Sequence, residues 1–220
     1  KMTCVSSDGE DGYPGRLVFT VEFVLTGRTL HIGYSAVSDK DTIWAPTHHF
    51  YFNMNGPIGY ANSNHLTIYA DAYTPVDKEL IPLGYKADVT GTPFDFRTPK
   101  TIAQDFNAPH RALEYAGGYD HCFNFVGGET KEPVKRCEVY DAKSGRVMTV
   151  YTNQPCVQFY SGNFLNNEKY PFKNNYPQGL QNAMCLETQK MPDSINHDNF
   201  TNCVLRPGET YKHVTIYEFT

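Results

Sequence analysis

The chain has 220 residues, a formal net charge of −5, 40% hydrophobic residues and 14% aromatic residues, which is enough for one large β domain or two small ones. Tight nucleic-acid binding needs a concentrated basic surface that displaces phosphate counterions, and the absence of any Lys/Arg run excludes this class. No stretch approaches the ~20 apolar residues that cross a bilayer, so no membrane association is expected.

Short runs of β-branched and aromatic residues recur along the chain, separated by Gly, Pro, Asn and Asp. The first two runs, residues 17–25 and 29–37, flank Thr26-Gly27-Arg28 and predict a hairpin. The later runs alternate with a period of two and are expected to form strands over residues 66–73, 148–152, 157–160 and 214–219. Such a series is typical of an all-β sandwich or barrel.

Signals for other structure are few. Residues 98–103 predict one helical turn, and residues 163–182, rich in Asn, Tyr, Lys and Pro, predict a long irregular loop. Long loops in compact domains are uncommon and often functional. Because no repeat or low-complexity linker interrupts the chain, we expect a single domain over residues 1–220.

The cysteines are far apart and include no C-x-x-C pair. They are Cys4, Cys122, Cys137, Cys156, Cys185 and Cys203. A zinc site usually has closer spacing, so no metal site is predicted. Three disulfides are possible, but a chain with this much core does not need them. We therefore favour reduced thiols and a cytoplasmic protein, and the sequon at residues 199–201 does not overturn this interpretation.

Three segments contain residues suited to acid–base chemistry, and the first places His48 and His49 beside aromatic residues. Desolvation by apolar rings tunes a histidine pKa, which suits a general acid near neutral pH. Adjacent residues of a strand point to opposite faces, so only one of the two is expected to face a given pocket. A half-buried histidine bonded to backbone is the alternative.

The second segment, residues 117–125, has two glycines followed by Asp120 and a histidine. Glycine lets the backbone turn tightly before the acidic residue. Asp120 could accept hydrogen bonds from sugar hydroxyls, or it could cap an Asx turn.

The third segment, residues 184–197, places Glu187 inside an apolar, strand-like stretch. Partial desolvation there would raise the pKa of the carboxyl, as a general base that works near neutral pH requires. A surface glutamate on a strand face is the alternative.

Taken in order, these and other segments resemble the aldose 1-epimerase family, the galactose mutarotases. Each segment alone is weak, but seven in the same order are specific, and together they cover essentially the whole chain. The stretches are SSDGEDGYPG (6–15), THHFYFNMNG (47–56), LTIYADAYTPVDKELIP (66–82), GTPFDFRTPKTI (91–102), YDHCFNF (119–125), QPCVQFYSGNFL (154–165) and CLETQKMPDSINH (185–197).

The resemblance implies a large twisted antiparallel β-sandwich and an isomerase that interconverts the α and β anomers of a free aldose, such as galactose or glucose, without a cofactor. A carboxylate would take the proton of the C1 hydroxyl while an imidazolium protonates the ring oxygen. The ring opens, rotates about C1–C2 and closes to the other anomer. One ionised carboxylate and one protonated imidazole are therefore needed at the same pH.

The resemblance also assigns roles by position. Glu187 in LETQ matches the base, and His49 in H-x-Y-F-N matches the acid. Asp120 in YDH and Gln158 in VQFY match residues that bind the sugar.

The chain departs from the family pattern in three respects. His48 stands where Asn is common, and Cys156 stands where Gly is usual, which could alter the turn before Gln158. Family members also begin with roughly a third more chain, which contributes an arginine and a histidine to the site. We expect the missing N-terminal strands to be supplied by a separate polypeptide, such as an N-terminal fragment of the same precursor, or to have been truncated. A catalytically impaired carbohydrate-binding or regulatory homologue, or a relative acting on hexose phosphates, is the alternative function.

Overall fold

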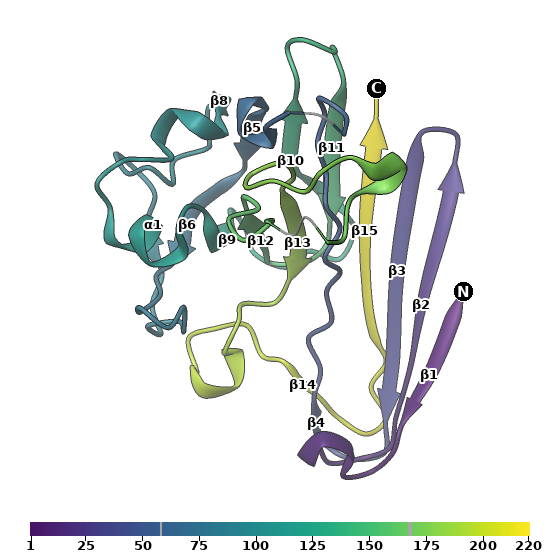
Figure 1. The fold of residues 1–220 in the computed structure, drawn as a ribbon. Helices are drawn as coiled ribbons and strands as arrows, with labels where there is room; N and C mark the ends of the chain where they lie inside the picture. The colour runs from purple at the N-terminus through teal and green to yellow at the C-terminus, as the bar shows by residue number, and fades with distance from the viewer. Residues whose placement is uncertain (58, 167–168) are drawn as a thin grey trace.

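The computed structural model describes residues 1–57, 59–166 and 169–220. In this part of the chain, antiparallel sheets dominate, as the sequence predicted (Figure 1). The strands β1 (Met2–Ser6), β2 (Leu17–Thr26), β3 (Thr29–Ser38) and β15 (Tyr211–Phe219) lie on one side of the molecule in this view, and α1 (Arg111–Ala116) lies on the other.

The largest sheet has eight strands in the order β1-β2-β3-β15-β11-β10-β5-β8. Every pairing recorded in it is antiparallel. In chain order its strands are β1 (Met2–Ser6), β2 (Leu17–Thr26), β3 (Thr29–Ser38), β5 (His65–Ile68), β8 (Lys100–Thr101), β10 (Val134–Tyr140), β11 (Val147–Thr152) and β15 (Tyr211–Phe219).

The second sheet has five strands in the order β13-β12-β9-β6-β7, and a separate two-stranded pair joins β14 to β4. The five strands are β6 (Ala70–Thr74), β7 (Ala87–Asp88), β9 (Asp120–Phe125), β12 (Cys156–Tyr160) and β13 (Cys185–Gln189). The pair is β4 (Thr42–Ile43) and β14 (Val204–Leu205).

Short helical elements connect the strands. The 3₁₀ turns are η1 (Glu10–Gly12), η2 (Ala61–Ser63), η3 (Ile102–Asp105), η4 (Lys173–Asn175) and η5 (Ser194–Asn196). The α-helix α1 (Arg111–Ala116) was not predicted, because six residues are too few to establish a helical period. Its ends do carry signals, since the His110 ring accepts a hydrogen bond from Ala112 N and Gly117 is left-handed.

The predicted hairpin is confirmed. Thr26 pairs with Thr29 across a turn made by Gly27 and Arg28, and Gly27 has a φ of 59°, a conformation that glycine adopts without steric cost. The predicted strands over residues 148–152, 157–160 and 214–219 correspond to β11, β12 and β15.

The prediction of one strand over residues 66–73 is wrong. The chain changes sheets at Tyr69, so that Ile68 pairs with Cys137 in the eight-stranded sheet and Ala70 pairs with Phe125 in the five-stranded sheet. Tyr69 N donates to Arg136 O at 3.0 Å at the crossing point. Side-chain alternation continues through the change of sheet, which is why a period of two does not reveal it.

Two expectations for irregular structure fare differently. The helical turn expected at residues 98–103 lies slightly later, in η3, because Lys100 and Thr101 pair with β5. The described residues of the range 163–182 form irregular structure as expected, interrupted by η4. Residues 167 and 168 of that segment lie outside the described residues.

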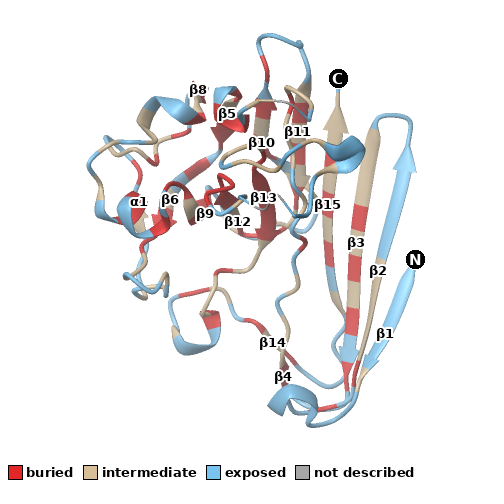
Figure 2. Cartoon of the chain, viewed as in Figure 1, coloured by how far each residue is buried: buried red, intermediate tan, exposed pale blue. Residues whose placement is uncertain are grey.

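The main core lies between the two large sheets and is formed by apolar side chains from both (Figure 2). The five-stranded sheet contributes Phe123, Phe159 and Leu186, and the eight-stranded sheet contributes Ile68, Val139, Val150 and Tyr217. By contrast, β1 and the second half of β2 are exposed. Within the described residues, no helix has the length and apolar character needed to cross a bilayer.

Candidate active site

Three neighbouring strands at one end of the five-stranded sheet, β13, β12 and β9, place three of the predicted site residues together. Gln158 pairs with Glu187 across β12 and β13, and Asp120 pairs with Tyr160 across β9 and β12. Residues opposite each other or two apart on a strand share a face. The side chains of Asp120, Gln158 and Glu187 therefore lie on one face.

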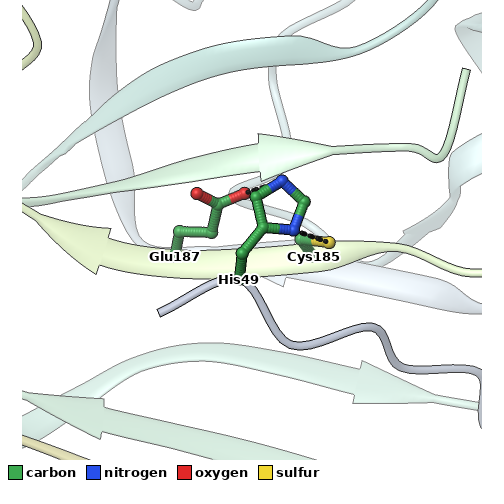
Figure 3. A group of neighbouring side chains, drawn as sticks. All are labelled: His49, Cys185 and Glu187. Carbon is green, nitrogen blue, oxygen red and sulfur yellow. Dashed lines mark hydrogen bonds and ion pairs between the residues drawn. The ribbon is translucent and has the colours of Figure 1, made fainter. Parts of the chain in front are cut away.

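The fourth predicted residue, His49, comes from an extended segment that runs beside β13. This segment is fixed where Phe52 and Met184 exchange backbone hydrogen bonds of 2.8 and 2.9 Å. His49 Nε2 lies 3.4 Å from Glu187 Oε1, and its Nδ1 lies 3.4 Å from Cys185 Sγ (Figure 3). The His49 side chain is 53% exposed, whereas that of Glu187 is 10% exposed.

The environment of Glu187 matches the need for a base near neutrality. Burial, followed by the negative charge of Asp120, raises the pKa of Glu187 from 4.5 to about 7. A general base is most effective when its pKa lies near the working pH, because it is then both available and basic enough. The alternative of a surface glutamate is excluded by its burial.

Asp120 and Gln158 form the polar neighbour of this pair. Gln158 Nε2 donates to Asp120 Oδ1 at 2.7 Å. Burial raises the pKa of Asp120, and the hydrogen bond from Gln158 and the charge of His49 oppose that rise. Gln158 Oε1 is buried without a hydrogen-bond partner in the protein, so it is an acceptor that the protein itself leaves unsatisfied.

The adjacent histidines point in opposite directions, as predicted. The ring of His48 is buried, with Nδ1 3.2 Å from Tyr34 Oη and Nε2 hydrogen-bonded to Tyr217 Oη. Burial, with a smaller effect from His49, lowers the pKa of His48 to about 4. His48 is therefore neutral near pH 7 and belongs to the core.

Sequence reasoning missed Cys185, and it left the consequences of Cys156 open. Cys185 precedes Glu187 by two residues on β13, so strand alternation would have placed its thiol beside the carboxylate. Cys156 begins β12 and takes an ordinary position there, paired with Asn124 and Gln189, so no special turn precedes Gln158.

Two tyrosines that sequence reasoning also missed surround the His49 ring. Its centroid lies 5.0 Å from that of Tyr51 and 5.9 Å from that of Tyr160. Tyr160 could have been found by the same alternation, since it lies two residues after Gln158 on β12. Tyr51 lies outside a regular strand, and no periodic signal marked it.

An antiparallel β fold that holds a buried carboxylate against an imidazole has the groups that acid–base chemistry requires, and comparison with known proteins identifies the family. The family model described as Aldose 1-epimerase matches residues 1–218. The chain belongs to the aldose 1-epimerase family.

Individual relatives agree with this assignment. The chain is 44% identical over 218 residues to galactose mutarotase from Mus musculus, covering 98% of this chain and 61% of that protein. It is 38% identical to aldose 1-epimerase from Escherichia coli K12, covering 97% of this chain and 62% of that protein. The crystal structure of galactose 1-epimerase from Lactobacillus acidophilus NCFM superposes with a TM-score of 0.83 at 30% identity, covering 99% of this chain and 61% of that one. The chain thus spans about three-fifths of the length of these relatives.

Proposed function

We propose that this chain carries the acid–base centre of an aldose 1-epimerase, or mutarotase, which interconverts the α and β anomers of a free hexose such as galactose or glucose. The observation that supports this most strongly is the 3.4 Å approach of Glu187 Oε1 to His49 Nε2. It joins a buried carboxylate to a half-exposed imidazole, two groups that can exchange protons with a substrate in opposite directions.

The proposed reaction begins when Glu187 removes the proton of the C1 hydroxyl and His49 donates a proton to the ring oxygen. The C1–O5 bond breaks, C1 becomes a carbonyl carbon, and rotation about C1–C2 presents its other face. The reverse transfers close the ring and restore both groups, so no cofactor is consumed. Each group is expected to contribute about 10²–10⁴-fold.

Asp120 and Gln158 are proposed to bind sugar hydroxyls. The Asp120 carboxylate can accept from a hydroxyl while it also accepts from Gln158 Nε2. The unpartnered Gln158 Oε1 offers a second acceptor on the same face. Fixing the sugar beside Glu187 and His49 would present the C1 hydroxyl to the carboxylate and the ring oxygen to the imidazole.

The test is the rate of anomer equilibration of freshly dissolved α-galactose, followed by polarimetry or NMR. Acceleration by the protein, and its loss in Glu187→Gln, would support the proposal. Gln keeps the size of the side chain but cannot act as a base. Sugar binding without acceleration would contradict the enzyme and favour a non-catalytic carbohydrate-binding protein.

We further propose that activity depends on additional chain from the same precursor, which covers the β1–β2 side of the molecule. Large apolar side chains are exposed there, among them Met2, Val24 and Leu25, the last at 73%. An apolar hollow lies at the other end of β2 and is lined by residues that include Leu17, Phe19 and Trp44. Exposed apolar surface of this extent commonly marks an interaction site.

The intact mass of the protein purified from its source tests this second proposal. A single chain heavier than 24.9 kDa, or a second polypeptide that co-purifies with this one, is expected. A lone chain of that mass with full mutarotase activity would contradict it.

A cytoplasmic location is also proposed. It is supported by six free thiols, five of them buried, since oxidising compartments favour disulfides. Cell fractionation followed by immunoblotting tests it, and recovery with secreted material would contradict it.

A further inference from the structure

Cys185 adds a third potential metal ligand to the pair described above. One nitrogen of His49, Sγ of Cys185 and a carboxylate oxygen of Glu187 all lie within 4.8 Å of one another. Cys185 and Glu187 are two residues apart on β13, so the strand fixes both on the same face. Figure 3 shows the His49 ring between them, with one nitrogen toward each.

This ligand set favours one class of metal ion. Zn²⁺ is coordinated by thiolate, imidazole and carboxylate at about 2.0–2.3 Å, whereas Mg²⁺ and Ca²⁺ prefer oxygen ligands. Because the His49 ring now lies between the other two groups, it must turn to share one ion with them. Its side chain is half-exposed and can turn, while the other two side chains are held by a buried strand.

We propose that His49, Cys185 and Glu187 form an inhibitory site for Zn²⁺ or a similarly thiophilic divalent cation. The ion would occupy the imidazole and the carboxylate that the proposed acid–base reaction requires. A water molecule would complete a tetrahedral site. The ion is therefore an inhibitor in this proposal and has no part in the reaction.

The charges around Cys185 suit a divalent cation better than a free thiolate. The carboxylates of Glu187 and Asp120 lie on the same face of the sheet as the Cys185 thiol. When the ion binds, the S–H bond breaks, the sulfur–metal bond forms and the proton passes to water. The two positive charges of the ion offset the carboxylates that disfavour the thiolate.

Metal binding at this site does not depend on mutarotase activity, whereas the inhibitory role rests on the proposed function. In the described part of the chain, no other group of three such side chains converges in this way. The exposed thiol of Cys4 provides a matched control, since it is accessible to any metal that binds cysteine without a built site.

The experiment is a titration of the full-length protein with Co²⁺, a spectroscopic substitute for Zn²⁺, followed by absorption. A thiolate-to-cobalt charge-transfer band that saturates at one equivalent and is displaced by Zn²⁺ is expected. Cys185→Ser should abolish the band, and Cys4→Ser should leave it unchanged. No band in the unaltered protein, or a band that survives Cys185→Ser, would overturn the proposal.

A second variant guards against a misfolded Cys185→Ser protein. His49→Ala changes a half-exposed side chain and should weaken Zn²⁺ binding measured by calorimetry by at least about tenfold, the lower end of the effect of changing a supporting residue. Unchanged Zn²⁺ affinity in this variant, with circular dichroism showing an intact fold, would overturn the site. Mg²⁺ should not compete with Zn²⁺ in the same cell.

Measurements of mutarotase activity then distinguish the proposed metal site from the proposed function. If the protein accelerates anomer equilibration, Zn²⁺ should slow it and Mg²⁺ should not, while rapid equilibration with the site filled would overturn the inhibitory role. A protein that binds Co²⁺ through Cys185 but has no mutarotase activity would contradict the proposed function and leave the metal site supported.

Discussion

The two faces of the five-stranded sheet are built from the same strands but have opposite character. On one face, Phe159 and Leu186 pack into the core between the sheets, both about 1% exposed or less. On the other, Gln158 and Glu187 are their immediate neighbours in sequence and form part of a polar cluster with Asp120. Adjacent residues of β12 or β13 therefore point alternately into the core and into the candidate active site.

The difference indicates that packing on the core face must offset the loss of folding stability that the polar face causes. Two carboxylates, Asp120 and Glu187, are partly desolvated near each other, and the pKa of each is raised as a result. Such an arrangement destabilises the ionised folded protein. It persists because the aromatic core on the other face is stabilising, an exchange of stability for function that is common at active sites.

The largest expected effect compares two adjacent histidines that face these two environments. His49→Asn should reduce mutarotation by about 10²–10⁴-fold because the proposed acid is lost. His48→Asn should retain mutarotation but lose about 1–3 kcal/mol of unfolding free energy, because hydrogen bonds to Tyr34 and Tyr217 are disturbed. Polarimetry and urea denaturation measure the two quantities. Equal losses of activity in both variants would contradict the assignment of His49 to the active site and of His48 to the core.

The core face is tested by Phe159→Ala. Phe159 is fully buried against Phe96, Tyr119 and Phe123, and its truncation leaves a cavity that costs about 3–5 kcal/mol. Phe164→Ala is the matched control, since that ring is 69% exposed and should change stability by less than about 0.5 kcal/mol. Urea denaturation of both variants checks this, and similar costs would contradict the assigned core.

Much of this arrangement could be predicted from local sequence. Alternation of apolar and polar residues identified the hairpin, the strand that contains Gln158 and the C-terminal strand. A strand buried on one face shows this period of two in its own sequence. Alternation could not reveal the change of sheet at Tyr69, because Leu66, Ile68 and Ala70 keep the same alternation across that point although β5 and β6 have different partners. Sheet membership is decided by distant strands.

The candidate active site could likewise be predicted only in part from local sequence. The acidic and histidine segments were identifiable from their residue types, and the family resemblance connected Glu187 to His49. Which histidine faces the site depends on the bridge between Phe52 and Met184, residues far apart in sequence. Cys185 was predictable from its spacing to Glu187, but its contact with His49 Nδ1 depends on the same bridge.

The pH dependence of stability tests the cost of the polar face. The pKa of Glu187 is raised from 4.5 to about 7 in the folded protein, so the folded state holds more protons than the unfolded state between these values. Stability from this residue is therefore present below pH 4.5 and lost as pH rises towards 7. At 1.36 kcal/mol per pKa unit the shift is worth about 3 kcal/mol at most.

Glu187→Gln isolates this contribution. Relative to the unaltered protein, the variant should gain about 1–3 kcal/mol of unfolding free energy above pH 7, and its stability should fall less between pH 5 and 7. Urea denaturation at several pH values gives both curves. Parallel curves for the two proteins would mean that Glu187 titrates normally in the folded state.

The smallest expected effect concerns the coupling between the two carboxylates. Asp120→Asn removes the negative charge that, after burial, contributes to the raised pKa of Glu187. The pKa of Glu187, followed by NMR of its carboxyl carbon, should therefore fall, but by less than about one unit because burial remains. Gln158→Met is the control, since it removes the hydrogen bond to Asp120 and leaves the charge in place, so the pKa of Glu187 should change less than in Asp120→Asn. A larger change in Gln158→Met would mean that hydrogen bonding, and not charge, connects the two carboxylates across β12.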